Sequence, residues 1–165
     1  MAKLQKITPC LWFDNEAEPA AQFYTSVFKN SRITAVTRYG DAGREIHKKE
    51  PGTALTVAFE LDGQAFTALN GGPNFKFTEA ISLQVDCATQ DEVDHFWSKL
   101  SEGGEPRAQQ CGWLKDKYGL SWQVVPNILP QLLSSSDKVK SGRAMQAMLQ
   151  MKKLDIAKLQ QAYDG

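Results

Sequence analysis

The sequence has no excess charge of either sign, no long apolar run, and only two histidines and three cysteines. Its 165 residues carry 19 basic and 19 acidic side chains, so electrostatics favour neither nucleic acid nor an anionic membrane as a partner. No apolar run approaches the roughly 20 residues that span a bilayer, and the first ten residues lack the apolar stretch of a secretory signal. We therefore expect a cytoplasmic protein that binds neither nucleic acid nor membrane.

Cysteine is scarce and widely spaced. Cys10, Cys87 and Cys111 form no C-x-x-C pair, which argues against a zinc ribbon or a thioredoxin-type redox site. Buried or half-buried free thiols are expected, because free cysteine packs as a small hydrophobe. Cys111 lies near Lys115, which could activate a thiolate, but no histidine is placed to act as a base. A structural role is therefore favoured.

The sequence contains an internal repeat. The stretches 18–28 and 91–100 share an acidic start, an aromatic pair and an aliphatic end, and Phe96 follows Phe23 by 73 positions. Apolar residues recur in both at intervals of three and four, which predicts two amphipathic helices.

Signals for helix starts precede both stretches. Asn15 and Glu18 are predicted to form a capping box, and Pro19 must then lie in the first turn of its helix. Thr89 or Asp91 is predicted to cap the second helix.

Strand-like stretches surround the predicted helices. Asp62-Gly63 indicates a hairpin between two of them. Each half thus has a strand, a helix and then antiparallel strands, and the second half is shorter by most of one strand. The predicted strands cover 6–13, 32–40, 53–63, 64–72, 80–87, 108–116 and 119–126.

The predicted fold class is α+β, with two βαβββ modules and C-terminal helices. The modules cover about 4–72 and 78–128 and form one domain over 1–130. A half of about 60 residues cannot bury both faces of its sheet alone, so the two are expected to pack side by side and enclose a cavity.

A helical extension is predicted over 131–165. Ser136 or Asp137 is expected to cap one helix and Asp155 another. The methionines of the segment 145–151 suit adaptable packing, either on the sheet body or across a dimer; the alternative is a lid over the cavity.

Three stretches together resemble a known family: 7–33, 68–85 and 111–126. They are similar to the PhnB-like branch, often labelled 3-demethylubiquinone-9 3-methyltransferase-like, of the vicinal oxygen chelate superfamily, which includes glyoxalase I, bleomycin-resistance proteins and extradiol dioxygenases. The resemblance implies the paired-module fold and a homodimer.

The methyltransferase activity in that label is not expected. A site for S-adenosylmethionine needs closely spaced glycines in a turn that opens a helix behind a parallel strand. Gly71-Gly72 follows a predicted hairpin strand, and Gly103-Gly104 follows a predicted helix. We therefore expect no cofactor.

The resemblance also implies four positions for metal ligands, on the first and last strands of each half. The superfamily's motifs and the repeat spacing place them on Ile7 (or Thr8, after a slip of one residue), Asn70, Ala80 and Gln123. Aliphatic side chains offer no donor, and amides bring no charge, so we expect no tightly bound transition metal. The two histidines lie elsewhere, and His47 belongs to a charged segment, 44–52, that is expected to be a solvated loop.

The cavity is expected to combine polar groups with apolar walls. An apolar pocket with a few convergent amides suits a neutral or weakly polar small molecule. Asn70 and Gln123 are expected to be equivalent positions on the closing strands of the two halves. In the alternative reading, the buried amides only hydrogen-bond each other and fill the centre of the cavity. The candidate ligand-binding residues are Leu11, Phe13, Asn70, Ser82, Gln84, Trp113 and Gln123.

Three functions are compatible with the sequence. The first is a metal-free small-molecule-binding protein whose ligand is unknown, and it is the one we expect. The alternative is an enzyme of the glyoxalase or dioxygenase type with a non-standard active site. The third is an interaction protein whose cavity is filled and whose methionine-rich tail makes the contacts.

Overall fold

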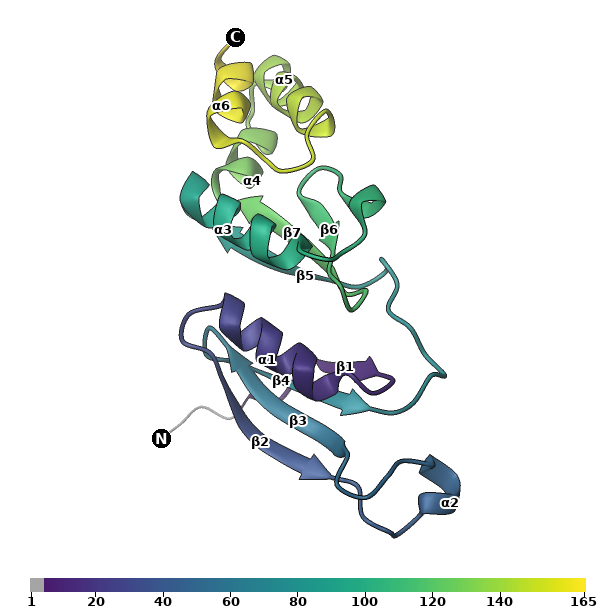
Figure 1. Cartoon of the computed structure of the whole chain (residues 1–165). Coiled ribbons are helices and arrows are strands. Elements are labelled where there is room, and N and C mark those ends of the chain that lie inside the picture. Colours follow the sequence, from purple (N-terminus) through teal and green to yellow (C-terminus); the bar gives the residue numbers. More distant parts are fainter. Residues whose placement is uncertain (1–4) are drawn as a thin grey trace. The chain divides into compact units, whose positions relative to one another are not determined.

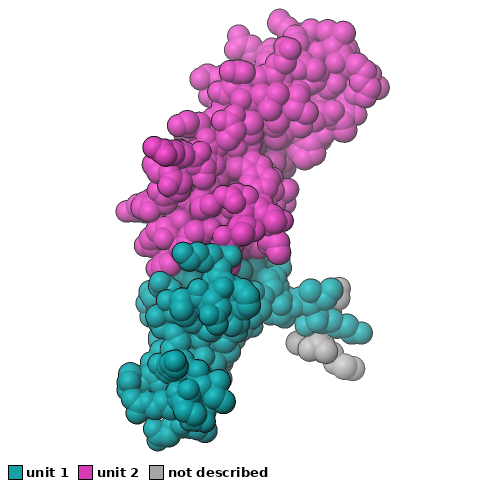
Figure 2. Space-filling model, turned by 90° about the vertical axis from the view of Figure 1, so that its right-hand side faces the viewer, with its two compact units in different colours: residues 1–76 teal, residues 77–165 magenta. Residues whose placement is uncertain are grey.

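The computed structural model describes residues 5–165. The chain divides into two compact units, Met1–Lys76 and Phe77–Gly165 (Figures 1 and 2). The described residues form seven strands and six α-helices, which confirms the α+β class. None of these helices is long and apolar enough to cross a membrane. The prediction that both modules form one domain stays a prediction.

Unit 1 is a βαβββ module. Its sheet has the order β1-β4-β3-β2, with β1 parallel to β4 and the other pairs antiparallel. The predicted hairpin joins β3 to β4, and both Asp62 and Gly63 have the positive φ that such a turn requires. The elements are β1 (Cys10–Phe13), α1 (Ala17–Val27), β2 (Arg32–Arg38), the short α2 (Arg44–His47), β3 (Ala54–Leu61) and β4 (Gln64–Asn70).

Helix α1 covers one face of this sheet (Figure 1). Its small residues, such as Ala20 and Ala21, are fully buried and let it approach β3 and β4 closely. Tyr24 is also fully buried, and its ring stacks on Phe59 of β3 with centroids 6.3 Å apart. The buried stripe predicted from the spacing is therefore the contact between helix and sheet.

Unit 2 begins with a shorter module of the same plan. Its sheet has the order β5-β7-β6, with β5 parallel to β7 and β6 antiparallel to β7. The elements are β5 (Ser82–Cys87), α3 (Gln90–Ser101), a 3-10 turn (Pro106–Ala108), β6 (Trp113–Lys115) and β7 (Ser121–Pro126). The loss of one strand relative to unit 1 confirms the prediction.

The helices of the two units repeat at the predicted spacing. Val93 and Leu100 are the buried residues of α3, and they follow buried Ala20 and Val27 of α1 by 73 positions. Thr89 caps α3, because its hydroxyl accepts a hydrogen bond from the backbone N–H of Glu92 at 3.2 Å.

The first strands of the two units repeat at a spacing of 74 residues instead. The Phe13 carbonyl accepts from the Gly71 N–H at 2.9 Å, and the Cys87 carbonyl accepts from the Asn127 N–H at 2.8 Å, so Phe13 and Cys87 correspond. Three residues separate β1 from α1, whereas two separate β5 from α3. A shift of one residue moves a strand's side chains to the other face, so the helix spacing cannot align the strands.

The C-terminal helices α4 (Ile128–Leu133), α5 (Lys138–Leu149) and α6 (Ile156–Asp164) pack within unit 2. Asp137 caps α5 and Asp155 caps α6, as predicted. Packing on the sheet body, one of the three possibilities for this extension, is confirmed because a strand residue belongs to its core. That core consists of Val125 of β7 with Leu129, Leu132, Ala144, Leu154 and Leu159.

The segment between α5 and α6 also clamps the turn that leads into β6. Cys111 and Gly112 at the centre of this turn both have positive φ, 50° and 84°. Their outward N–H groups donate to the carbonyls of Met151 and Lys152, each at 2.8 Å. The extension thus holds the backbone that positions Trp113 at the start of β6.

The substitution Gly112→Ala tests this clamp. A new Cβ at this position would lie 2.9 Å from the Val124 carbonyl oxygen and 3.0 Å from Leu154 Cδ1. We expect a loss of about 1–2 kcal/mol from the positive φ and about 1–3 kcal/mol more from the contact. Urea unfolding measures both.

Gly119→Ala is the matched control, because Gly119 has nearly the same φ, +86°, and nothing within 4 Å of its new Cβ. Gly119→Ala is expected to lose only the unfolding free energy that an alanine at positive φ costs, about 1–2 kcal/mol. Equal losses in the two variants would contradict the close packing of the extension on this turn.

Candidate functional site

The face of the unit 2 sheet that points away from α3 carries most of the predicted site. Helix α3 packs against all three strands and buries residues such as Val85, Leu114 and Trp122 on the other face. Cα partners in neighbouring strands share a face, so the side away from α3 has two rows of side chains that run across β6, β7 and β5. The C-terminal helices cover Val125, the next residue of β7 on this side, and leave these two rows uncovered by a helix. We call this side the open face of unit 2, and its rows are Trp113, Gln123 and Gln84, and Lys115, Ser121 and Ser82.

Hydrogen bonds already order the polar groups of this face. Gln123 Nε2 donates to Ser82 Oγ at 2.9 Å, and Gln84 Nε2 donates to Asp86 Oδ1 at 2.7 Å. The hydroxyl proton of Ser82 and the amide oxygen of Gln123 are the donor and the acceptor that these two side chains retain for further partners. The half-buried indole of Trp113 supplies apolar surface in the same row.

A cation lies in the second row and was not among the predicted site residues. Lys115 Nζ forms an ion pair with Glu79, and the Lys115 side chain is only 23% exposed. The hydrogen bond from Lys115 is the largest cause of a lowered pKa for Glu79. The signal was present in the sequence, because Lys115 lies two residues after Trp113 and a strand repeats its faces every two residues.

The structure separates the seven predicted site residues into two groups. Ser82, Gln84, Trp113 and Gln123 share the open face of unit 2. The other three lie in unit 1 on the face that α1 covers, where Leu11 pairs with Ala68 and Phe13 pairs with Asn70. Periodicity predicted which residues share a face, but not which face the helix would cover.

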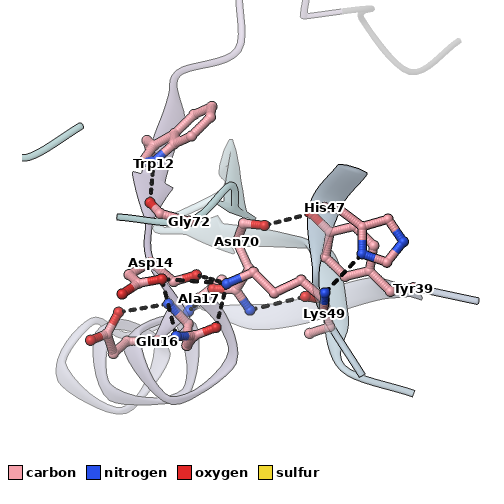
Figure 3. Close-up of polar contacts among 11 residues, drawn as sticks. Trp12, Asp14, Glu16, Ala17, Tyr39, His47, Lys49, Asn70 and Gly72 are labelled. Atoms are coloured by element: carbon pink, nitrogen blue, oxygen red, sulfur yellow. Dashed lines mark hydrogen bonds and ion pairs between the residues drawn. The ribbon is translucent and has the colours of Figure 1, made fainter. Parts of the chain in front are cut away.

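Asn70 is buried at the start of α1 and is 1% exposed (Figure 3). Its Oδ1 accepts from the Ala17 N–H at 2.8 Å, and its Nδ2 donates to the Ala54 carbonyl at 2.9 Å. Asn70 therefore pairs with one of the N–H groups that a helix leaves without an intrahelical partner at its start. The sequence predicts this capping role for Asn15 and Glu18 instead.

The predicted capping box of Asn15 and Glu18 is therefore wrong. The N-cap residue of α1 is Glu16, and its side chain makes no hydrogen bond to the first turn of the helix. Glu18 instead forms an ion pair with Arg38 at 3.1 Å, and Asn15 Oδ1 accepts from Lys49 Nζ at 2.5 Å. The residue that takes their place is 53 positions away from Ala17, beyond the reach of a local capping pattern.

The equivalence of Asn70 and Gln123 is also wrong. Gln123 pairs with Gln84, which corresponds at the 74-residue spacing to Cys10 of β1. Cys10 pairs with Thr67, so Thr67 is the unit 1 counterpart of Gln123. The alignment was in error by three residues, an odd number, which placed the two amides on opposite faces of their sheets.

The four positions assigned to metal ligands do not fit a divalent transition metal. Ile7 is 85% exposed and precedes β1, and Ala80 is exposed and precedes β5. The Asn70 amide is hydrogen-bonded at both ends within unit 1. Of the four positions, only Gln123 could still offer a ligand atom, and that atom belongs to a neutral amide. Among residues 5–165, no three His, Cys, Asp or Glu side chains group closely enough to hold a metal ion. The absence of a tightly bound metal stays a prediction.

The charged segment around His47 is mostly exposed, as predicted, but it begins with the short helix α2, and its His47 and Lys49 side chains are half-buried in contacts within unit 1 (Figure 3). The Lys49 side chain is only 11% exposed, and its Nζ donates to the Asp14 carbonyl at 2.8 Å. His47 Nδ1 accepts from the Lys49 N–H at 2.9 Å, and its ring lies on Tyr39 with centroids 4.4 Å apart. These contacts lock the connection between β1 and α1.

The three cysteines have different surroundings. Burial raises the pKa of Cys87 to about 12 and is the cause of a raised pKa for Cys10, so both are thiols at neutral pH and poor nucleophiles. Cys111 is half-buried. The prediction of buried or half-buried thiols is wrong for Cys10, which is exposed on the uncovered face of β1.

The glycine pairs serve internal packing. A Cβ on Gly71 would come within 2.2 Å of the Trp12 ring, and one on Gly104 within 2.1 Å of the Lys115 carbonyl oxygen. The chain therefore fills both close approaches with its own atoms. Neither pair fits the glycine-rich turn of a methyl-donor site.

The β6–β7 connection holds the other end of the open face. Asp116 is buried, and its carboxylate accepts from the Leu120 N–H at 3.1 Å and the Trp122 indole N–H at 2.8 Å. Beside it lies a shallow hollow of about 280 Å³, lined by Gly103, Gly104, Glu105, Lys115, Asp116, Lys117 and Gly119. The buried carboxylate fixes the backbone that follows Lys115.

Comparison with known proteins gives a consistent family. The model of the family described as 3-demethylubiquinone-9 3-methyltransferase matches residues 5–125. The PhnB protein from Bacillus cereus is 39% identical, with 74% of this chain and 99% of that chain covered and a TM-score of 0.63. The chain belongs to this family. It is a PhnB-like member of the vicinal oxygen chelate superfamily.

Two further solved structures are similar over the same share of this chain, 74%. A protein from Staphylococcus aureus is 30% identical over 96% of its length, with a TM-score of 0.34. PA1353 from Pseudomonas aeruginosa is 19% identical over 98% of its length, with a TM-score of 0.57, and shows the fold alone. No curated protein matches the chain.

The substitution Asn70→Ala tests the role that the structure gives this amide. It leaves the Ala17 N–H and the Ala54 carbonyl without their partner, and each buried unpaired group costs about 1–3 kcal/mol. We expect a large loss of unfolding free energy in urea denaturation.

Gln123→Ala is the control, because Gln123 is half-exposed and water can replace its bond to Ser82. A loss within about 1 kcal/mol is expected. If the two variants lose the same stability, Asn70 does not cap α1.

Proposed function

We propose that this PhnB-like protein binds a small, weakly polar molecule on the open face of unit 2, without a tightly bound transition metal. The observation that carries the proposal is the row of Trp113, Gln123 and Gln84, with the Ser82 hydroxyl bonded to Gln123 beside it. An aromatic surface next to oriented amides is the combination that small-molecule sites use.

The degree of burial supports binding over a purely structural role. Gln84 is exposed, and Ser82, Gln123 and Trp113 are half-buried, whereas a residue that only fills a core is buried like Val124. Ser121, at the centre of the second row, is only 2% exposed and does not enter the proposed site. A ligand that replaces water on the Gln84, Ser82 and Gln123 side chains gains little per hydrogen bond, about 0.5–1.5 kcal/mol. The apolar contact with the indole therefore supplies most of the affinity.

The metal-free part of the proposal rests on donor chemistry. Divalent transition metals take thiolate, imidazole or carboxylate ligands, and the open face of unit 2 presents amides, hydroxyls, an ammonium group and the Asp86 carboxylate, which already accepts from Gln84. In the part of the chain that the structure describes, no three His, Cys, Asp or Glu side chains group closely enough to hold a metal ion. Leu11, Phe13 and Asn70, on the covered face of unit 1, do not enter the proposed site.

Two further expectations belong to the same proposal. A cytoplasmic location agrees with the balanced charge. A homodimer agrees with the superfamily and with exposed apolar residues on α5, Met145 and Leu149.

Binding of benzamide, a neutral aromatic amide, tests the proposal. Titration followed by NMR should shift the indole N–H of Trp113 and the side-chain amides of Gln84 and Gln123. Trp113→Ala should weaken binding about tenfold or more, and Gln123→Leu several-fold, since 1.4 kcal/mol is a factor of ten.

Gln64→Leu, an exposed amide in unit 1, is the matched control and should leave the affinity unchanged. Elemental analysis of the dialysed protein should find no stoichiometric zinc, nickel or iron. Shifts confined to other residues, or a stoichiometric metal that is lost in Gln123→Ala, would overturn the proposal.

A further inference from the structure

The Lys115–Glu79 ion pair lies at the edge of the proposed site, and the proposed function above does not use it. Lys115 shares a row with Ser82 and lies two residues from Trp113 on the same strand face. We propose, on the basis of that proposed function, that the ligand carries one carboxylate on its otherwise weakly polar body, and that this carboxylate displaces Glu79 from Lys115 and takes the Ser82 hydroxyl as a second donor.

The burial of the two partners shows which of them is replaceable. The Lys115 side chain is 23% exposed, so its ammonium group is largely removed from water and needs an anionic partner. The Glu79 side chain is 65% exposed, and Glu79 belongs to the chain segment that precedes β5, outside any strand. An exposed carboxylate gains little from an ion pair and returns to water easily.

The chemistry of the present partner indicates the class of ligand. The chain holds one of its own carboxylates against Lys115, so the cation accepts a carboxylate of matching size and charge. The lowered pKa of Glu79 agrees with a favourable interaction between this ammonium group and an ionised carboxylate.

The spacing of the rows sets the length of the ligand. Lys115 and Trp113 are two residues apart on β6, which separates their side chains by about 7 Å. When the ligand's carboxylate is bound at Lys115 and Ser82, a six-membered ring in the ligand spans this distance. The group para to the carboxylate then lies beside Trp113 and Gln123. An aromatic acid with a polar group para to the carboxylate fits this span.

Glu79 acts as a built-in competitor in this arrangement. It keeps Lys115 paired when no ligand is bound, and any anionic ligand must displace it. Removing its charge should therefore raise the affinity for carboxylates and leave the affinity for neutral molecules unchanged.

The experiment compares 4-carbamoylbenzoate with benzamide, its neutral counterpart, on the full chain by NMR titration. Wild type should bind the carboxylate more tightly than benzamide. Glu79→Gln should tighten 4-carbamoylbenzoate about three- to tenfold, and Lys115→Met should weaken it about tenfold or more, while both variants bind benzamide like wild type.

Lys117→Met is the matched control, because Lys117 is the next lysine along the chain, lies in the β6–β7 connection outside both rows, and has its Nζ over the Tyr118 ring at 5.6 Å. It should leave both affinities unchanged. Equal binding of 4-carbamoylbenzoate by wild type, Glu79→Gln and Lys115→Met, or no binding of it at all, would overturn the inference.

The two proposals fail in different ways. If benzamide still shifts Trp113 and Gln123 but the carboxylate brings no dependence on Lys115, only this inference is wrong. If neither probe shifts the open face of unit 2, the proposed function itself is wrong.

Discussion

Each small sheet of this chain has one face buried under a helix, and this burial decides which side chains can reach a ligand. In unit 1 the contact of Tyr24 with Phe59 and the bond from Asn70 to the start of α1 fix the covered face. In unit 2 buried Leu114 and Trp122 mark the covered face, and their neighbours Trp113 and Gln123 must point the other way. The candidate site follows from this alternation.

The sequence predicted the repeat, the strands and the helix caps Thr89, Asp137 and Asp155, because these depend on local periodicity and on side chains within one helical turn. It could not align the strands of the two units. The β–α connection differs by one residue between them, and a single residue reverses the faces, so Thr67 rather than Asn70 corresponds to Gln123.

Other features depend on contacts between residues far apart in the chain. Asn70 caps a helix that starts 53 residues earlier, and Lys49 reaches Asp14 across 35 residues. The carbonyl of Met151 holds the turn before Trp113. No local pattern contains these pairings, yet they hold the start of α1 and the turn that leads into β6.

The central claim is that a ligand meets the open face of unit 2 and not the face of unit 1 under α1. Intermolecular nuclear Overhauser effects from bound benzamide measure this most directly. The account predicts effects to the Trp113 indole and the Gln123 side-chain amide, and none to Phe13 or to the Asn70 amide. Effects to Phe13 and Asn70, with none to Trp113, would contradict it.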